Sequence, residues 1–278
     1  MQYGPADRVL LDRSPDNGDD EASETHPREG LPPTFRMRHD EHYVDQLIRP
    51  APDGTPAAPI GPLAALCPAV TVELAESLEA ASACLTLNTG ETRGTFTGRV
   101  ARELLGIELH RATRLARAAA FLTAPHQPVL RDLLISGLIH DVVAATDAAR
   151  RMLGVKMDVA IADRETWMRA DSQLLTLALA GTADAMLSQV TGPGAMRLVV
   201  RGTGLSSSVT VEISMTPAPS PVPAARLFDA RDAGHPWGAS AGLLLSAAAQ
   251  VAGVHGGRVD VRAPAAGECT IVFVLPRR

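Results

Sequence analysis

The sequence predicts an α+β protein in which a two-helix hairpin, forming a four-helix bundle in a dimer, precedes an α/β sandwich. Three observations support this prediction. Apolar residues make up 46% and aromatic residues only 3% of the 278 residues, which favours an aliphatic core of packed helices. Two apolar repeats with alternating spacings of four and three residues follow one another, as in paired amphipathic helices. Strand-like and helix-like segments then share the C-terminal part.

Composition excludes several classes of protein. The formal net charge is −5, which argues against nucleic-acid binding through a basic surface. No apolar run approaches the roughly 20 residues of a membrane span, and the N-terminus lacks the pattern of a secretory signal. Cys67, Cys84 and Cys269 lie far apart in sequence and form no metal pair. We therefore expect a soluble cytoplasmic protein with no metal site, membrane segment or nucleic-acid partner.

Residues 1–60 are expected to form a disordered or partly helical arm and linker. This stretch is charged, rich in proline and poor in large apolar residues, so burial cannot offset its loss of conformational entropy. Within it, residues 36–49 carry several apolar side chains and form either a short docking helix or a solvated arm. His39 and His42 lie there without further metal ligands nearby.

A helical hairpin is predicted over residues 68–124. Its first helix repeats apolar residues at alternating spacings, and the glycines of 88–95 break the pattern before the second helix. A lone hairpin cannot cover both of its apolar sides, so we expect a homodimer through residues 70–122. The predicted seams consist of Leu74, Leu78, Ala81 and Leu85 in the first helix and Leu105, Leu109, Ala112, Ala116 and Ala119 in the second.

The third predicted region, 127–278, is a sandwich with helices on one face of a mixed sheet. A helix is expected over 128–153, and another begins at Asp171, a plausible N-cap. A third helix precedes His255, where HGG ends it. The proline-rich segment 216–223 cannot be regular structure. Strands are expected over 155–161, near Trp167, over 196–202 and 207–215, and in a closing hairpin over 258–264 and 268–276.

Three stretches carry a resemblance to a known family. They are VTVELAESLEAASACLTL from Val70, RADSQLLTLALAGTADAML from Arg169, and AGLLLSAAAQVAGVHGGRVDVRAPAAGECTIVFVLP from Ala241. In this order they resemble the phosphoacceptor helix, the asparagine-bearing helix and the C-terminal part of bacterial sensor histidine kinases. The resemblance spans residues 70–278. It implies that region 127–278 is a histidine-kinase-like ATPase domain and that the chain acts in a two-component system.

The residues that perform chemistry in that family are replaced here. Val72 stands where the kinases carry the phosphoacceptor histidine, and valine has no nucleophilic nitrogen. Ala185 matches the magnesium-binding asparagine, while Asp184 reaches that position only with a one-residue shift. We therefore expect no catalytic residue on the hairpin and no magnesium site.

The nucleotide loops of the family are also altered. The loop that holds adenine through an aspartate and two glycines corresponds to Pro217, Pro219 and Pro221, which replace glycine flexibility with proline rigidity. The phosphate loop retains Gly242 but carries Leu244 where a triphosphate would approach the backbone. The resemblance, read with these losses, implies a pseudokinase that binds neither ATP nor magnesium.

Charged residues on the hairpin are candidates for partner contacts. Glu73, Glu76 and Glu79 lie near the missing histidine, where the family contacts the receiver domain of a response regulator, although they fit a solvated helix face equally well. Arg111 and Arg114 lie one turn apart on the second helix. They either meet an acidic partner or neutralise glutamates of the hairpin. The expected partner is a receiver domain or a histidine kinase.

Two further readings remain open. The chain is an atypical histidine kinase or phosphotransferase if His110 or His140 serves as a displaced phosphoacceptor, a role that the local pattern does not favour over a polar helix face. Alternatively, the former nucleotide cleft holds another small molecule, for which the sequence offers no positive sign.

Overall fold

A computed structural model describes residues 66–87, 95–124, 127–202, 207–219, 222–229, 235–262 and 267–277. The predictions for 1–60, including residues 36–49, His39 and His42, lie outside these ranges. The chain divides into two compact units, Met1–Pro50 and Ala51–Arg278. Every element below belongs to the second unit.

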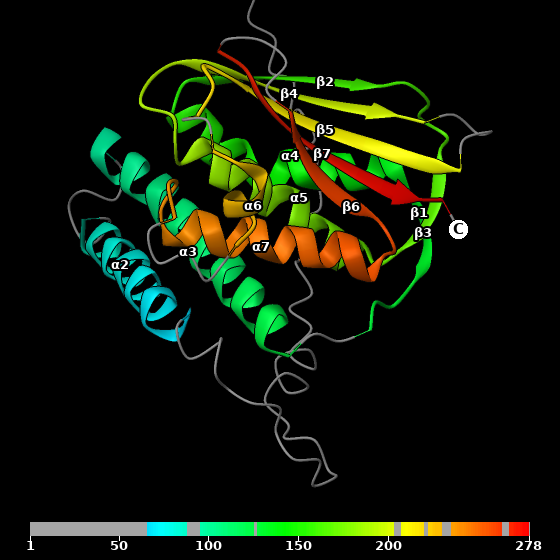
Figure 1. The fold of residues 1–278 in the computed structure, drawn as a ribbon. Helices are drawn as coiled ribbons and strands as arrows, with labels where there is room; N and C mark the ends of the chain where they lie inside the picture. The colour runs from blue at the N-terminus through cyan, green and yellow to red at the C-terminus, as the bar shows by residue number, and fades with distance from the viewer. Residues whose placement is uncertain are drawn as a thin grey trace, which may run out of the picture. The chain divides into compact units, whose positions relative to one another are not determined.

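The predicted helical hairpin is present as α2 (Leu66–Leu87) and α3 (Phe96–Thr123), which lie side by side (Figure 1). Thr95 is the N-cap of α3, because its hydroxyl accepts a hydrogen bond from the backbone N–H of Gly98 at 3.2 Å. The hairpin therefore begins its second helix with an ordinary side-chain cap.

The buried face of α2 is rotated away from the predicted seam. Leu74 packs against the core and Ala81 is buried, but Leu78 and Leu85 are each 55% exposed. The same face also takes in Ser77 and Cys84. In a repeat with alternating spacings of four and three residues, successive apolar side chains lie alternately on the two edges of one stripe along the helix. A small rotation of the helix therefore buries one edge of the stripe and exposes the other.

The predicted apolar seam of α3 is likewise partly buried and partly exposed. Ala112 is buried, whereas Leu109 and Ala116 are exposed. Leu115 and Phe121, which the seam did not include, are buried in the core. The prediction of an amphipathic helix is confirmed, but part of its predicted inner face lies on the outside.

The predicted helix over 128–153 is wrong over residues 128–134. Residues Arg131–Leu134 form a strand, β1, and α4 runs over Ile135–Met152. β1 pairs antiparallel with β3 (Trp167–Ala170), with Leu134 opposite Trp167. Two charged residues followed by two leucines are too short a pattern to distinguish a strand from the start of a helix, and the backbone partner of β1 decided between them.

The central sheet has five strands in the order β2–β4–β5–β7–β6. β2 and β4 run parallel, and every other neighbouring pair is antiparallel. The predicted strands and the closing hairpin are thereby confirmed. Their bounds are β2 (Val155–Ile161), β4 (Gly194–Arg201), β5 (Ser208–Thr216), β6 (Arg258–Arg262) and β7 (Cys269–Pro276).

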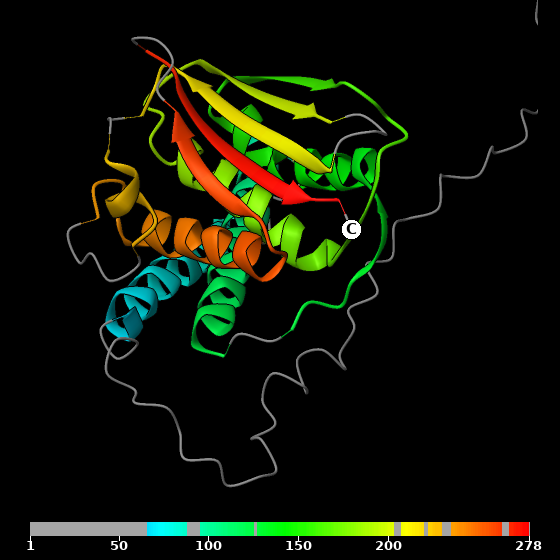
Figure 2. The ribbon, with the colours of Figure 1, turned by 45° about the vertical axis from the view of Figure 1, so that its right-hand side comes forward.

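Three helices cover one face of this sheet, as Figures 1 and 2 show. They are α4, α5 (Ser172–Leu187) and α7 (Ala239–Val254), and the short α6 (Ala224–Leu227) lies beside α7. The main core lies between these helices and the sheet. This confirms the predicted segregation of helices to one face.

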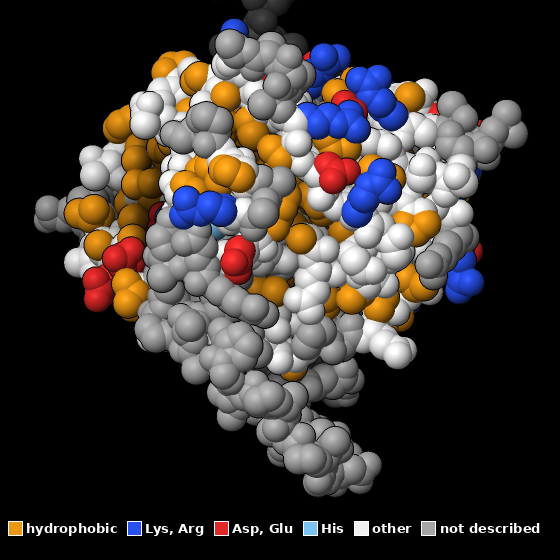
Figure 3. Space-filling view, in the orientation of Figure 1, with side chains coloured by type: hydrophobic (Ala, Val, Ile, Leu, Met, Phe, Trp, Pro, Cys, Tyr) orange, Lys and Arg blue, Asp and Glu red, His pale blue; other side chains and the backbone are white. Residues whose placement is uncertain are grey.

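The other face of the sheet is more polar. Arg201 and Arg262 lie 3.2 and 3.6 Å from the carboxylate of Glu212, and Figure 3 shows blue, red and apolar side chains interspersed on the face in view. One covered and one polar face are typical of a sheet with antiparallel strands. Among the described helices, none combines the length and hydropathy needed to cross a bilayer.

A buried polar network joins the ends of α5 and α7. Oδ1 of Asp171 accepts hydrogen bonds from Gln173 and Leu174 of α5, and Oδ2 accepts one from the backbone N–H of Val129. The backbone N–H of Asp171 donates to Nε2 of His255 at 3.0 Å, so Nδ1 of that ring donates to the carbonyl of Val251. The predicted N-cap and helix end are both confirmed.

Candidate functional site

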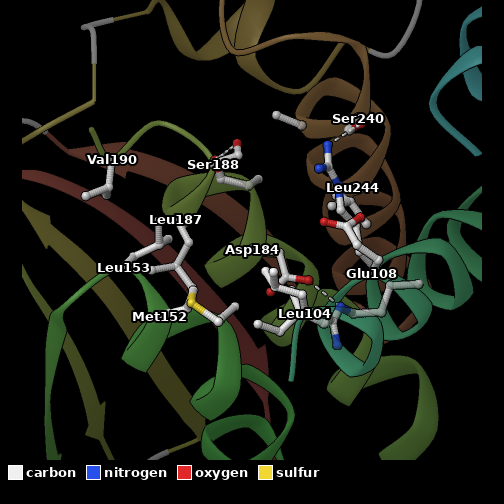
Figure 4. Close-up of a pocket in the computed structure, with 16 residues that line it drawn as sticks. Leu104, Glu108, Met152, Leu153, Asp184, Leu187, Ser188, Val190, Ser240 and Leu244 are labelled. Carbon is white, nitrogen blue, oxygen red and sulfur yellow. Dashed lines mark hydrogen bonds and ion pairs between the residues drawn. The ribbon is translucent and has the colours of Figure 1, made fainter. Parts of the chain in front are cut away.

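A cavity of about 280 Å³ lies where the hairpin meets the sandwich. Its walls come from α3 of the hairpin and from α4, α5 and α7 of the sandwich (Figure 4). Five of the positions singled out from the sequence line it, namely Arg111, Arg114, Asp184, Ala185 and Leu244. The fold thus brings candidate residues from three helices to one place.

Asp184 of α5 forms an ion pair with Arg114 of α3. Both side chains are nearly buried, and Arg114 also donates to the backbone carbonyl of Ala145 at 3.3 Å. Burial raises the pKa of Asp184 to about 6, although the charges of Arg114, Arg111 and His110 act to lower it. Loss of hydration therefore outweighs the attraction of the neighbouring cations.

A second contact joins α3 to the start of α7. Nη2 of Arg111 donates to the hydroxyl of Ser240 at 3.3 Å. Arg111 and Arg114, which lie one turn apart, together reach three helices of the sandwich, α7, α5 and α4. Both arginines predicted to contact a partner are engaged within the chain in this arrangement, and the acidic group that Arg114 meets is Asp184.

Gly242, the glycine that the family resemblance matches to a phosphate loop, lies directly beneath a side chain. A Cβ placed on it would be 2.8 Å from Cδ2 of His235 and 2.9 Å from Cγ. The imidazole is buried and oriented at both nitrogens: Nδ1 accepts from the backbone N–H of Trp237, and Nε2 donates to the carbonyl of Leu227. The bare backbone at Gly242 is therefore covered by His235.

Two residues further along α7, an apolar side chain packs against α5. Leu244 is buried and packs against Gly181 of α5, where an added Cβ would lie 3.3 Å from its Cδ2. Ala185, one residue beyond Asp184, is also buried. Helices α5 and α7 are therefore in close contact near Gly181 and Leu244.

Of the prolines matched to the family's adenine loop, Pro217 and Pro219 do not line the cavity. Pro217 is exposed after β5 and Pro219 is buried, while Pro221 lies outside the described residues. The backbone N–H of Ala218 between them donates to the carbonyl of Gly267 at 2.8 Å. The segment is thus tied to the β6–β7 turn.

Of the α2 residues expected to contact a partner, those that the structure describes are exposed. Val72 is 56% exposed, and Glu76 and Glu79 are exposed on the same helix. The side chain of Glu73 lies outside the described part. The position that matches a phosphoacceptor is therefore on the surface but carries only methyl groups.

The two histidines considered as alternatives are separate from one another. His110 is exposed on α3, with Nδ1 2.7 Å from the carbonyl of Gly106 in its own helix. His140 is exposed on α4. Within the described ranges, no group of three or more His, Cys, Asp or Glu residues is arranged to hold a metal ion.

Sequence reasoning missed His235 and its support. The carbonyl of Trp237 accepts from Nε2 of Gln189 at 3.0 Å, and Trp237 is itself buried. No spacing or motif marks this cluster, because its members come from the segment after α5 and from the segment before α7. Only the tertiary structure brings them together.

Comparison with known proteins shows similarity in structure alone. No protein-family sequence model matches the chain, and no curated protein matches it. The histidine kinase ShkA, solved at full length with AMPPNP, gives a TM-score of 0.52 at 19% identity, covering 76% of this chain and 45% of ShkA. The kinase AdeS of Acinetobacter baumannii gives 0.49 at 11% identity, covering 74% and 98%.

A third solved structure is the catalytic domain of the histidine kinase ThkA. It gives a TM-score of 0.45 at 15% identity and covers 53% of this chain and 95% of that domain. At these identities the comparisons establish architecture and not activity. The mixed five-stranded sheet with helices on one face, preceded by a helical hairpin, is a histidine-kinase-like fold.

Proposed function

We propose that this chain is a catalytically inactive histidine-kinase-like regulatory protein of two-component signalling. It dimerises through its hairpin and binds the receiver domain of a response regulator or a partner histidine kinase. The fold supports a place in this kind of signalling, and the altered site supports a role that depends on binding and not on phosphoryl transfer.

The observation that carries the proposal is the imidazole of His235 lying over Gly242. Backbone N–H groups at a helix N-terminus hold phosphate only when the anion can approach them closely. A buried ring with hydrogen bonds at both nitrogens lies against the Cα of Gly242, where the missing side chain would otherwise leave room for a close approach. Leu244 adds a branched side chain one half-turn further along the helix.

The metal-binding position supports the same reading. Magnesium needs oxygen ligands in a nearly octahedral arrangement. Asp184 offers a carboxylate, but that carboxylate is paired with Arg114 and buried. Ala185, the residue in the unshifted register, offers no ligand at all.

An uncovered apolar surface supports dimerisation. Leu78 and Leu85 lie seven residues apart on the outside of α2, and Leu109 and Phe96 are exposed on α3, Phe96 to 74%. A second hairpin placed against this surface would bury it and complete four helices. Glu76 and Glu79 remain exposed for a partner.

The test has two parts. Calorimetric titration with Mg·ATP is expected to show no binding up to about 1 mM, the upper end of ordinary enzyme affinities, and incubation with labelled ATP or a phosphorylated regulator is expected to leave no acid-labile phosphate. Tight ATP binding, or phosphate lost in His110→Ala or His140→Ala, would establish the kinase or phosphotransferase alternative instead.

Partner binding is tested with the receiver domains and histidine kinases of the same genome. At least one is expected to bind, and a Glu76→Lys, Glu79→Lys double variant is expected to weaken that binding at least tenfold. Glu165→Lys, an exposed charge reversal on the sandwich, is the matched control. If no receiver or kinase binds, or if all phosphotransfer rates are unchanged by the chain, the proposal fails.

A further inference from the structure

The cavity between hairpin and sandwich has mostly hydrocarbon walls. The apolar side chains of the lining include Leu104 and Ile107 of α3, Met152 and the adjoining Leu153 at the end of α4, Leu187 of α5 and Leu244 of α7. Water in such a space finds few of the two to four polar partners that it needs. The space is therefore better suited to an apolar molecule than to solvent.

Three of the four charged side chains of the lining are already engaged across the cavity wall. Arg114 pairs with Asp184, and Arg111 donates to Ser240. The lining holds two arginines and two carboxylates, Glu108 being the fourth, so their formal charges cancel. A charged ligand would add a net charge to this neutral lining and would lose hydration on entering it.

The volume limits the size of the occupant. At about 280 Å³, the cavity lies near the lower end of pockets that take small molecules, about 300 Å³. A bicyclic aromatic or a branched hydrocarbon of similar size fits this range. A nucleoside triphosphate is larger and carries several negative charges.

We infer that this cavity binds an uncharged, hydrocarbon-rich small molecule of about bicyclic size, and that binding holds the hairpin against the sandwich. The second part follows from the walls, since α3 supplies one side and three sandwich helices supply the others (Figure 4). A molecule that contacts both sides binds the docked arrangement better than a separated one and so favours it. This inference does not rest on receiver binding or on dimerisation.

The test uses the purified 278-residue chain with three probes of one size: 2-naphthol, which is neutral at pH 7, 2-naphthoate and 2-naphthylmethylamine. Calorimetry is expected to give one site per chain for 2-naphthol, with affinity at least tenfold above that of either charged probe. Hydrogen exchange of α3 amides is expected to slow when 2-naphthol binds. Absence of binding, equal affinity for the three probes, or unchanged exchange in α3 would overturn the inference.

Variants on α4 locate the site. Met152→Trp at the partly exposed rim is expected to weaken 2-naphthol binding at least tenfold by filling the cavity. Ala144→Trp, exposed on the same helix and outside the lining, is the matched control and is expected to leave affinity unchanged. Leu104→Phe, on the opposite wall, serves the same purpose if Met152→Trp does not fold. Equal effects of cavity and control variants would place the probe elsewhere.

Discussion

At the scale of single residues, two contacts define the surroundings of the positions singled out on α5 and α7. His235 lies over Gly242, and Arg114 pairs with the carboxylate of Asp184. The first contact fills the space beside a glycine, and the second pairs a buried charge. The consequences can be measured one residue at a time.

Gly242→Ala is expected to destabilise the protein by about 1–3 kcal/mol, the usual range for overpacking a core. The new methyl group would lie 2.8 Å from the His235 ring, which is held by hydrogen bonds at both nitrogens. Urea unfolding measures the change. Gly253→Ala on the same helix, with no atom within 4 Å of the added Cβ, is the control and should be neutral or stabilising by roughly 0.5–1 kcal/mol.

Asp184 should make stability depend on pH in an unusual direction. Its pKa rises from 3.8 in the unfolded chain to about 6 in the folded protein, so the folded state binds the proton more tightly. Below pH 3.8 both states are protonated, and above pH 6 the ionised carboxylate weakens the fold. The contribution of this group to the free energy of unfolding should therefore fall by up to about 3 kcal/mol between pH 4 and 6.

The measurement is urea unfolding of the natural chain and of Asp184→Asn across this pH range. Other titrating groups contribute equally to both proteins, so the difference between their free energies of unfolding isolates Asp184. The free energy of unfolding of the natural chain minus that of Asp184→Asn should decline as pH rises. A flat difference from pH 4 to 7 would show that burial does not raise the pKa of this carboxyl.

At the scale of elements, α3 is the helix on which the arrangement depends. It contacts α2 along one side, and through Arg111 and Arg114 it reaches α7, α5 and α4. The hairpin therefore joins the sandwich by specific polar contacts as well as by apolar packing. Loss of one arginine should loosen the whole helix.

Arg114→Met is expected to cost about 3 kcal/mol of unfolding free energy at pH 7, because removing one partner leaves the other charge buried without compensation. Protonation of Asp184, whose pKa is already about 6, keeps the cost from being larger. Amide exchange in α3 should quicken at the same time. Arg117→Met, an exposed arginine one turn further along, should change stability by less than about 0.5 kcal/mol.

At the scale of the whole molecule, the exposed apolar residues of the hairpin mark an incomplete surface. Single exposed leucines are common on protein surfaces, but Leu78 and Leu85 lie seven positions apart on one helix. A repeat of this kind is typical of a helix that meets another helix along its length. A second copy of the chain supplies a matching surface by symmetry.

Light scattering after size exclusion should therefore give twice the 29.2 kDa chain mass. The Leu78→Glu, Leu85→Glu double variant should give the single mass while keeping its helical content, since two charges cannot be buried unpaired between helices. Val129→Glu, at an exposed valine outside the hairpin, should remain dimeric. A monomeric natural chain at all concentrations would contradict the expectation.

Much of the architecture was predictable from local sequence. The strands of the central sheet, the N-cap at Asp171 and the end of α7 at His255 follow from alternation, capping residues and glycines. These signals are local, so tertiary structure is not needed to interpret them. β1 was not predicted because its four residues, two charged and two apolar, fit helix and strand patterns equally well until a partner strand is known.

The sequence alone determined that Val72, Ala185 and Leu244 carry neither a nucleophile nor a metal ligand, because a side chain's chemistry is set by its identity. Only the tertiary structure decided that His235 covers Gly242, that Arg114 meets Asp184, and which side of each hairpin helix is buried. These outcomes depend on residues far apart in the chain. Their contacts arise from helix rotation and packing, which no local pattern encodes.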